Sequence, residues 1–532
     1  TNWGNVRDTL IYSHVLDSQE SHGLKPLAAK YLGIPDDDLT DLKKAVISAR
    51  RQLTKENYPK GEEVEADYWL AGPELEEYAV NDARRTALLY AMYVNAIKQE
   101  GNKRAKENLF VQKGYLAELS PAWQVAREHA LLEKVYAMES EGLRVNKSLI
   151  VNKRRAFAAK GDEHAKRATS IAVRAGMPKD FNPGSSKQLQ VLLFDKWKLQ
   201  SVKATKSGSE STDAESLERL LDSCSRETTA GKFLQSLLDG RSYLKACSAL
   251  DEYERLAISY EHVHKLHPSF NQTGTHTTRF SSSNPNAQNV STDKEFSLRE
   301  VFGPSPGTFW IDADYSNLEM RLFAYAANEK RLIDAFDRGE TAHLPIAEEL
   351  YGPREKWKGL NKDDWTKSPE YKKTKNGNFS LIYGAGAPRA DKTYGVPGAY
   401  NRIRTRFTRL SEFMQETINK AKDQGYVETM FGYRLHVPPD RAYAAVNYLI
   451  QGTAGCAMKY AMLTFDSLTQ SGKMLATVHD ELVTEWPKSV LPGMAANITK
   501  IAMEAPGKLI GIPLPVDPDL IEKCWTVKTS IK

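Results

Sequence analysis

Apolar and polar positions recur along this chain in patterns that predict a mostly helical protein with a few strands. Apolar residues repeat at steps of three and four in residues 24–32 and 74–94, which is the spacing of one helix face. Charged, helix-favouring sequence continues through residues 126–174. Residues 203–213 have the glycine, serine and threonine density of a loop, and a helical pattern resumes from 214 to about 264.

One helix is predicted with defined ends. Ser368 is a suitable N-cap, Pro369 suits the first turn, and Glu370 lies near the positive end of the helix dipole. We expect this helix to continue to Tyr383, because Gly384 follows it directly.

One face of the same helix combines charge with aromatic rings. Lys372, Lys375, Phe379 and Tyr383 recur at steps of three and four. An aromatic stripe with this spacing ordinarily packs in a core, but lysine is rarely buried without a partner. The combination favours a charged, flat ligand such as a nucleoside triphosphate.

Two predicted strand ends carry carboxylates. Residues 309–315 form a candidate buried strand that ends with Asp312 and Asp314, and a hairpin is expected over 474–486 with Asp480 at its turn. Acids at a strand end can simply be solvated. Together, however, they provide what two-metal phosphoryl transfer requires, namely carboxylates from separate strands that converge on hard cations. Asp312 and Asp314 share a sheet face, so the pattern alone does not choose between them.

The composition is that of an ordinary globular protein. The 532 residues are 41% apolar and 27% charged, and the length predicts several domains. No apolar run approaches the roughly 18 residues that span a bilayer, so no membrane association is expected. The 4 cysteines are dispersed without a CxxC pair, which argues against a zinc ribbon or a disulfide framework and favours a reducing compartment.

The net charge of +5 is small, but its distribution is uneven. Residues 31–82 contain 6 basic and 13 acidic side chains, whereas residues 147–208 contain 14 basic and 4 acidic ones. Charge runs are usually solvated faces. One acidic and one basic module in a single chain nonetheless indicate separate domains, with the basic module facing phosphates.

Several motifs, in order along most of the chain, resemble those of family A DNA polymerases, the group of bacterial DNA polymerase I and many phage replicases. The resemblance is carried by DYSNLEMR (314–321) as motif A, KNGNFSLIYG (375–384) as motif B and VHDELV (478–483) as motif C. It continues in FNPGSSKQL and TKSGSESTD within 181–213, TTRFSSSNPNAQN (277–289), VETMFGYRLHVP (427–438) and NYLIQGTA (447–454).

The resemblance implies a catalytic site with two Mg²⁺ ions. It chooses Asp314 over Asp312 as a metal ligand, together with the Tyr315 carbonyl and Asp480. One ion would lower the pKa of the primer 3′-hydroxyl, and the other would hold the triphosphate. Lys375 is implied as a general acid for the leaving pyrophosphate.

Further residues are implied in contact with the substrates. Glu319 would exclude a ribose 2′-hydroxyl, Phe379 would pack against the incoming sugar, and Tyr383 would guard the template slot. The implied nucleotide-binding set is Ser316, Asn317, Glu319, His343, Lys372, Lys375, Phe379 and Tyr383. The set implied on the primer–template minor groove is Arg279, Gln288, Asn289, Asn447, Gln451 and His479.

Two positions depart from the family pattern. Tyr371 replaces an arginine four residues before the motif B lysine, and Tyr443 replaces another that precedes Asn447. Lys372 is displaced from the first position by one step, about 100° around the helix, so we do not expect it to reach the same phosphate oxygens. Nucleotide affinity or fidelity is therefore expected to differ from the family norm.

The N-terminal part resembles the end of the family's 3′→5′ exonuclease domain. Residues 8–33 match the stretch after the second exonuclease motif, and Tyr78 and Asp82 form the YxxxD of the third. No D-x-E pair of the first motif precedes Asp82, and we expect Asp8 to be structural. This chain alone is therefore expected not to proofread. The remnant should dock against the palm, or against a separate chain that completes the exonuclease domain. The start at Thr1 indicates a processed or partial chain.

The implied fold is α+β and multidomain. It is a right-hand polymerase with an antiparallel palm sheet and helical fingers and thumb, preceded by the partial, mostly helical exonuclease-like piece. The expected domains are 1–105 for the exonuclease-like part, 106–255 for a linker and the thumb, 256–327 and 425–532 for the palm, and 328–424 for the fingers.

The expected function is template-directed addition of dNTPs to a primer 3′ end, in phage or bacterial DNA replication. The expected location is the cytoplasm of a bacterial or phage-infected cell. A single-subunit RNA polymerase shares the palm and its aspartates, but Glu319 and the thumb pattern favour DNA. A catalytically inactive DNA-binding subunit is disfavoured by intact Asp314, Lys375 and Asp480. A repair role in place of a replicative one stays open.

Overall fold

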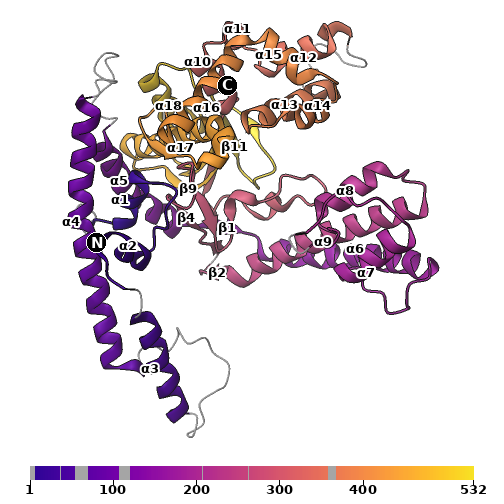
Figure 1. Ribbon diagram of the computed structural model, residues 1–532, viewed down its shortest axis with the longest axis horizontal. Coiled ribbons are helices and arrows are strands. Elements are labelled where there is room, and N and C mark those ends of the chain that lie inside the picture. The colour runs from indigo at the N-terminus through magenta and orange to yellow at the C-terminus, as the bar shows by residue number, and fades with distance from the viewer. Residues whose placement is uncertain are drawn as a thin grey trace.

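The computed structural model describes residues 6–35, 38–53, 70–106, 120–205, 208–261, 263–356 and 367–531. Figure 1 shows helices of the N-terminal part along one side, a bundle of helices projecting from the middle, and a further helical group above. A sheet with the C-terminal helices lies between these parts. No helix within the described ranges combines the length and apolarity needed to cross a membrane.

The centre of the molecule is a five-stranded antiparallel sheet. Its strand order is β12-β11-β6-β10-β9, so β6 and β10, the strands predicted to carry the acids, are direct neighbours. β6 is buried along most of its length, as its apolar Phe309, Trp310 and Ile311 predict. The strands are β6 (Thr308–Tyr315), β9 (Lys473–Val478), β10 (Glu481–Pro487), β11 (Val516–Ile521) and β12 (Thr529–Ser530). The predicted strand and hairpin, and the antiparallel sheet of an α+β fold, are confirmed.

Three long helices cover this sheet. They are α5 (Pro121–Glu141), α17 (Ala445–Leu468) and α18 (Pro492–Ile510). α18 packs against β6, β11 and α17, while α5 packs against β9 and α17. One continuous apolar core runs from Ile11 in the N-terminal helices through Trp310 in the sheet to Trp525. The N-terminal segments around Ile11, Leu27 and Tyr93 therefore share the core of this sheet.

The N-terminal part contains only helices within its described residues before 106. α2 has the predicted bounds, and α1 is preceded by the N-cap Asp8, whose Oδ1 accepts a hydrogen bond from the Leu10 N–H at 2.9 Å. This N-cap confirms the expected structural role of Asp8. The helices are α1 (Thr9–Leu16), α2 (Leu24–Leu32), α3 (Asp38–Leu53) and α4 (Pro73–Lys106).

Two long helices, α6 (Lys147–Arg174) and α9 (Thr229–Leu256), pack along each other and project from the sheet (Figure 1). Gly161 on α6 and Gly240 on α9 lie at their contact, where the lack of side chains allows close approach. A second apolar core, which includes Phe181 and Phe233, fills the far end of this bundle. The far end also contains α7 (Ser186–Gln190), the π-helix η6 (Val191–Lys196) and α8 (Ala214–Ser223).

Two helical patterns are interrupted in ways that the sequence analysis did not predict. The pattern expected from 214 to about 264 is wrong at its end, because α9 stops at Leu256 and strands follow. The Thr228 hydroxyl accepts a hydrogen bond from the Gly231 N–H at 3.0 Å, and this N-cap separates α8 from α9. The stretch 126–174 is broken at Gly142, whose φ of 64° favours glycine and leads into a short strand.

The helical group above the sheet follows β6 in the chain. α13 (Pro369–Ile382) has the predicted start, because the Ser368 hydroxyl accepts a hydrogen bond from the Tyr371 N–H at 3.0 Å, and Tyr383 is its C-cap. The other helices are α10 (Leu318–Ala327), α11 (Lys330–Asp337), α12 (His343–Tyr351), η9 (Arg354–Lys356), α14 (Ala387–Tyr394), α15 (Ala399–Arg406) and α16 (Thr408–Gln424).

Short elements connect these parts. Their bounds are β1 (Leu143–Val145), β2 (Ile258–Ser259), β3 (His264–Leu266), β4 (Ser269–Asn271), β5 (Ser281–Ser283), η7 (Ala287–Asn289), η8 (Leu298–Val301), β7 (Tyr426–Glu428), β8 (Arg434–His436) and η11 (Pro439–Ala444). The domain boundaries given above remain predictions.

Candidate active site

The sheet brings Asp314 and Asp480 together at one edge. Asp314 lies near the end of β6, and Asp480 lies in the turn between β9 and β10. The Tyr315 N–H donates to the Asp480 carbonyl oxygen at 3.3 Å, and Glu481 is the cross-strand partner of Asp314. His479 has a φ of 60°, which allows the tight reversal. Backbone pairing therefore holds the two acids predicted from separate strands.

These acids destabilise one another's charged forms. Asp314 remains exposed at the edge of the sheet, but reduced hydration and the charges of Asp480 and Glu481 raise its pKa to about 8. Loss of hydration also raises the pKa of Asp480, although a backbone hydrogen bond and Arg279 oppose the shift. A divalent cation would stabilise such a donor set. Asp314, Asp480 and the Tyr315 carbonyl therefore fit hard cations such as Mg²⁺.

A metal ion bound at these acids would take part of its coordination from other molecules. Within the described ranges, no group of three or more His, Cys, Asp or Glu side chains is arranged to hold a metal ion. The protein thus offers two carboxylates and a carbonyl. Water and substrate oxygens would complete the shell, as Mg²⁺ commonly requires.

Asp312, the alternative that the residue pattern leaves open, has a different environment. Its side chain is buried, and its Oδ2 accepts hydrogen bonds from Trp525 Nε1 at 2.8 Å and from Lys528 Nζ at 2.5 Å. Burial and the Glu481 carboxylate raise the pKa of Asp312 well above its usual range. The structure leaves Asp314 at the exposed end of the strand.

Glu481 is engaged by two cations that the sequence analysis missed. Arg299 donates through Nη1 and Nη2 to the two carboxylate oxygens, each at 3.0 Å, and Lys528 Nζ lies 3.0 Å from Oε1. Burial alone would raise the pKa of Glu481, but hydrogen bonds with Asp312 and Arg299 lower it to about 2. No local signal marks Arg299 or Lys528, because both reach Glu481 from distant segments.

The exposed face of α13 carries the predicted lysines and rings. Lys372 and Lys375 are exposed. The Phe379 and Tyr383 rings are stacked, with centroids 6.3 Å apart. This arrangement favours the triphosphate-binding role, which stays a prediction.

His343 lies buried against α13. Its ring is 1% exposed, Asn378 Nδ2 donates to its Nδ1 at 2.8 Å, and its Nε2 has no hydrogen-bond partner among the described residues. Burial and the charge of Lys375 lower the pKa of His343 to about 3, so the ring is neutral. Tyr371, at the first departure from the family pattern, packs edge-on against this ring with centroids 5.7 Å apart. Because His343 is buried in this structure, its predicted contact with phosphate requires that Nε2 become exposed.

Glu319 is held between the sheet edge and the end of α13. The Arg279 guanidinium forms an ion pair with its carboxylate, and the Tyr383 hydroxyl donates to its Oε2 at 3.4 Å. Burial raises the pKa of Glu319, while the charge of Arg279 opposes the shift. These contacts fix the carboxylate in place, as a steric gate requires.

The loop after Asp314 is fixed from two directions. The Ser316 N–H donates to the Pro515 carbonyl at 2.9 Å, and Arg321 Nε donates to the Ser316 carbonyl at 2.9 Å. Asn317 is left-handed with a φ of 56°, and the Thr341 hydroxyl donates to its Oδ1 at 3.2 Å. Ser316 and Asn317 are thus held in place by protein contacts in this structure.

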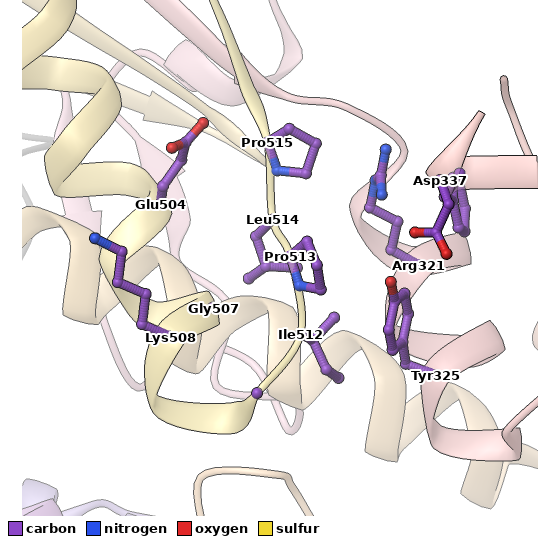
Figure 2. Close-up of a pocket in the computed structure, with 12 residues that line it drawn as sticks. Arg321, Tyr325, Asp337, Glu504, Gly507, Lys508, Ile512, Pro513, Leu514 and Pro515 are labelled. Atoms are coloured by element: carbon purple, nitrogen blue, oxygen red, sulfur yellow. The ribbon is translucent and has the colours of Figure 1, made fainter. Parts of the chain in front are cut away.

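A cavity of about 480 Å³ adjoins this loop (Figure 2). Arg321 and Tyr325 from α10 lie on one side, and Pro515 and Ile512 lie on the segment that leads into β11. Neither acid of the pair lines it, so this cavity is separate from the candidate metal site.

The predicted DNA-contacting residues form two groups. Arg279, Gln288 and His479 line one small cavity, where Gln288 Nε2 donates to the Thr477 carbonyl at 3.1 Å. Asn289 lies beside this cavity and is exposed.

The second group lies on α17. Asn447 and Gln451 are half-buried and one turn apart, and Gln451 hydrogen-bonds the Tyr383 side chain. Tyr443, at the second departure from the family pattern, is exposed, and its backbone packs against Gly384.

The predicted exonuclease residues Tyr78 and Asp82 are paired with cations of the same chain. Arg85 Nη1 donates to Asp82 Oδ1 at 3.1 Å, and the Lys25 ammonium lies 4.0 Å from the Tyr78 ring centroid. Asp38 forms ion pairs with both Lys25 and Arg85. The exonuclease origin of this part remains a prediction.

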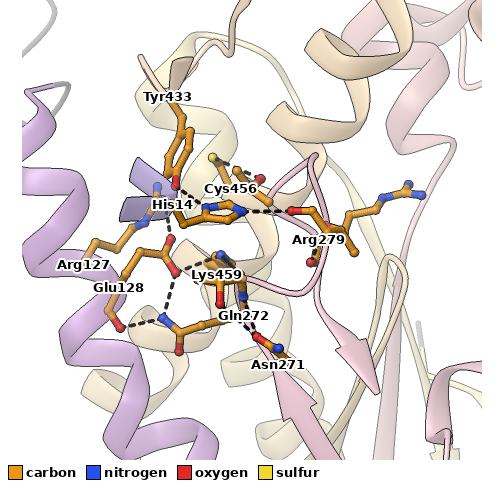
Figure 3. A network of polar contacts seen from close by, with 12 residues as sticks. His14, Arg127, Glu128, Asn271, Gln272, Arg279, Tyr433, Cys456 and Lys459 are labelled. Carbon is orange, nitrogen blue, oxygen red and sulfur yellow. Dashed lines mark hydrogen bonds and ion pairs between the residues drawn. The ribbon is translucent and has the colours of Figure 1, made fainter. Parts of the chain in front are cut away.

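A buried polar network fastens the N-terminal helices to the palm (Figure 3). The Tyr433 hydroxyl lies 2.6 Å from His14 Nδ1, and His14 Nε2 lies 2.9 Å from the Thr275 carbonyl oxygen. A neutral ring satisfies both contacts by donating from Nε2 and accepting at Nδ1. Nearby, Lys459 Nζ lies 2.8 Å from Glu128 Oε2. His14 thus joins α1 to the segments that contain Thr275 and Tyr433.

Comparison with known proteins identifies the family. The sequence model of DNA polymerase family A matches residues 151–526. DNA polymerase I of Caldicellulosiruptor bescii is 33% identical over 68% of this chain and 42% of its own length. DNA polymerase I of Rhizobium leguminosarum is 30% identical over 96% of this chain and 48% of its own length. Thermostable DNA polymerase I of Thermus aquaticus is 32% identical over 74% of this chain and 47% of its own length. The chain spans less than half the length of each of these relatives.

A solved structure supports the fold. The chain resembles the POL domain of Pol1 from M. smegmatis in complex with DNA primer-template and dNTP, with a TM-score of 0.74 at 24% sequence identity. The match covers 98% of this chain and 82% of that one. The predicted polymerase fold is therefore confirmed. Since the family match extends over most of the sequence and includes both acids and α13, the chain belongs to DNA polymerase family A.

Proposed function

We propose that this chain adds dNTPs to a primer 3′ end on a DNA template and releases pyrophosphate. The observation that carries the proposal is the placement of Asp314 beside Asp480, which the Tyr315–Asp480 backbone hydrogen bond and the pairing of Asp314 with Glu481 fix. Glu319 connects this edge to α13 through its contact with Tyr383. Membership of DNA polymerase family A and the DNA polymerase I relatives support the same reaction.

Asp314, Asp480 and the Tyr315 carbonyl would hold two Mg²⁺ ions. When bound, the ions would lower the pKa of the primer 3′-hydroxyl and neutralise charge on the triphosphate. The raised pKa of Asp314 supports a cationic occupant, because a cation would relieve the repulsion that disfavours the charged carboxylate.

The side chains around this edge would position the nucleotide. Lys375 and Lys372 would bind triphosphate oxygens, and Lys375 would donate a proton to the leaving pyrophosphate. Phe379 would pack against the sugar, and Tyr383 would guard the template slot. Glu319, already fixed by Arg279, would leave no room for a ribose 2′-hydroxyl.

The primer–template would contact two regions. The basic segment 147–208, which includes α6, would neutralise duplex phosphates without regard to sequence. Arg279, Gln288, Asn289, Asn447, Gln451 and His479 would contact the minor groove. The primer-template and dNTP in the complex of the M. smegmatis protein support these partners.

Primer extension tests the proposal. The purified chain is mixed with a 5′-labelled primer on a DNA template, Mg²⁺ and either dNTPs or rNTPs. We expect extension with dNTPs in preference to rNTPs. A preference for rNTPs would favour a single-subunit RNA polymerase, and DNA binding without extension would favour an inactive DNA-binding subunit.

The biological setting is also part of the proposal. We infer phage or bacterial DNA replication in the cytoplasm, which the bacterial origin of the relatives supports. A separate chain would supply the missing exonuclease carboxylates.

A further inference from the structure

The segment that follows β11 contacts β6 through Trp525 and β10 through Lys528. The Trp525 N–H donates to the Phe302 carbonyl at 2.9 Å, and the buried Trp525 ring donates through Nε1 to Asp312 Oδ2 at 2.8 Å. The Arg299 guanidinium stacks on the same ring, 4.3 Å from its centroid. This anchoring places Lys528 where its side chain reaches the acids of β6 and β10.

Lys528 bridges two carboxylates that are not the proposed metal ligands. Its Nζ lies 2.5 Å from Asp312 Oδ2 and 3.0 Å from Glu481 Oε1. Arg299 Nη1 and Nη2 also donate to Glu481 Oε1 and Oε2, each at 3.0 Å, so Lys528 and Arg299 share Oε1. Because Glu481 is the cross-strand partner of Asp314, its carboxylate lies beside the proposed metal ligands, where Lys528 and Arg299 together compensate its charge.

We propose that Lys528 is a positioning residue that keeps Glu481 and Asp312 out of the metal coordination, so that Asp314 and Asp480 alone supply carboxylates. The inference rests on the proposed function, because it assumes that Asp314 binds a cation. Each additional free carboxylate strengthens the binding of a hard cation and changes where the ion sits. The Lys528 ammonium removes this competition by occupying one oxygen of each acid.

A different result is expected if Lys528 only forms a structural ion pair. Loss of a partner from a structural pair lowers stability and leaves metal affinity unchanged or weaker. Loss of a positioning cation leaves carboxylate charge beside the metal site less compensated, so metal binding becomes tighter. Direct metal affinity therefore distinguishes the two roles.

The test measures Mn²⁺ binding to the full chain without DNA or dNTPs, from the electron paramagnetic resonance signal of free Mn²⁺. Lys528→Met removes the charge, Lys528→Arg keeps it, and Lys523→Met alters an exposed lysine on the same segment. We expect Lys528→Met to bind Mn²⁺ at least about threefold more tightly than the unaltered chain. The other two variants should bind Mn²⁺ as the unaltered chain does. Adding Glu481→Gln to Lys528→Met should restore the original affinity.

Several results would overturn the proposal. They are equal or weaker Mn²⁺ binding by Lys528→Met, tighter binding that persists in the double variant, and Mn²⁺ binding that Asp314→Asn does not reduce. Melting temperatures show whether each variant folds, and Lys528→Gln replaces the methionine variant if it does not. Primer extension by the unaltered chain reports separately on the proposed function. If Mn²⁺ binding follows the expected pattern but the unaltered chain does not extend primers, the positioning role of Lys528 holds and the proposed polymerase function is contradicted.

Discussion

The Tyr315 N–H donates a hydrogen bond to the Asp480 carbonyl oxygen at 3.3 Å. Because Tyr315 directly follows Asp314, this backbone contact helps to set the spacing of the two acids independently of side-chain rotamers. Asp314 lies on a paired strand, and this contact ties the turn that carries Asp480 to that strand. The proposed chemistry depends on that spacing.

The contacts of Glu319 predict how the chain selects sugars. We expect Glu319→Ala to raise the ratio of rNTP to dNTP incorporation about 10- to 100-fold, because the side chain that fills the space for a 2′-hydroxyl is removed. Glu319→Gln keeps the bulk and should keep the ratio low. Competitive single-nucleotide incorporation measures both, and an unchanged ratio in the alanine variant would contradict the gate.

The exposed face of α13 predicts different roles for neighbouring lysines. Lys375→Ala should lower kcat about 100-fold or more through loss of a general acid. Lys372→Ala should mainly raise the KM for dNTPs. Lys373→Ala is the matched control, because Lys373 is also exposed but lies off this face. Equal losses from Lys373→Ala and Lys375→Ala in steady-state extension would contradict the assignment.

The sequence was sufficient for features that depend on local patterns. The ends of α13 follow from Ser368, Pro369 and the glycine after Tyr383, and β6 follows from its apolar run, so both were predicted closely. The end of α9 was not, because the strands that follow it, β2 and β3, belong to a sheet that β1 completes from a distant part of the sequence.

The environment of the acids depends on distant residues. The spacing of Asp312 and Asp314 makes them equivalent, and the family resemblance alone separated them. Of the two aspartates, Asp312 is the one that Trp525 and Lys528 contact, and this sets their environments apart. No pattern within β6 contains that information.

The buried His14 predicts a loss of stability in mild acid. Burial lowers its pKa to about 4, whereas an exposed histidine has a pKa near 6.5. The folded state therefore binds fewer protons than the unfolded chain between these values, so the free energy of unfolding falls as pH falls from 6.5 toward 4. From pH 7 to pH 5, we expect this group to account for a loss of about 2 kcal/mol in urea unfolding.

His14→Gln provides the control for that measurement, because glutamine does not titrate. The difference between its unfolding free energies at pH 7 and pH 5 should be smaller by about the same 2 kcal/mol. An identical pH dependence in both proteins would show that His14 is not held neutral by the palm.

The ion pairs around Asp82 predict that the chain alone does not proofread. A two-metal exonuclease needs several carboxylates that converge on its ions, whereas Asp82 is paired with Arg85. A mismatched, end-labelled primer incubated with the chain and Mg²⁺, but without dNTPs, should keep its length. Shortening from the 3′ end that disappears in Asp82→Ala would contradict this prediction. Shortening only after a second chain is added would support a split exonuclease.

We propose that Asp314 and Asp480 carry the chemistry of primer extension. The most direct measurement is single-turnover extension by Asp314→Ala, Asp480→Ala and Asp312→Asn, with primer–template binding followed by fluorescence anisotropy. We predict that the first two variants lose extension by about 1,000-fold or more while they bind DNA nearly as the unaltered chain does. Asp312→Asn should retain most of its extension. Near-normal extension by Asp314→Ala, with extension lost in Asp312→Asn, would contradict the account.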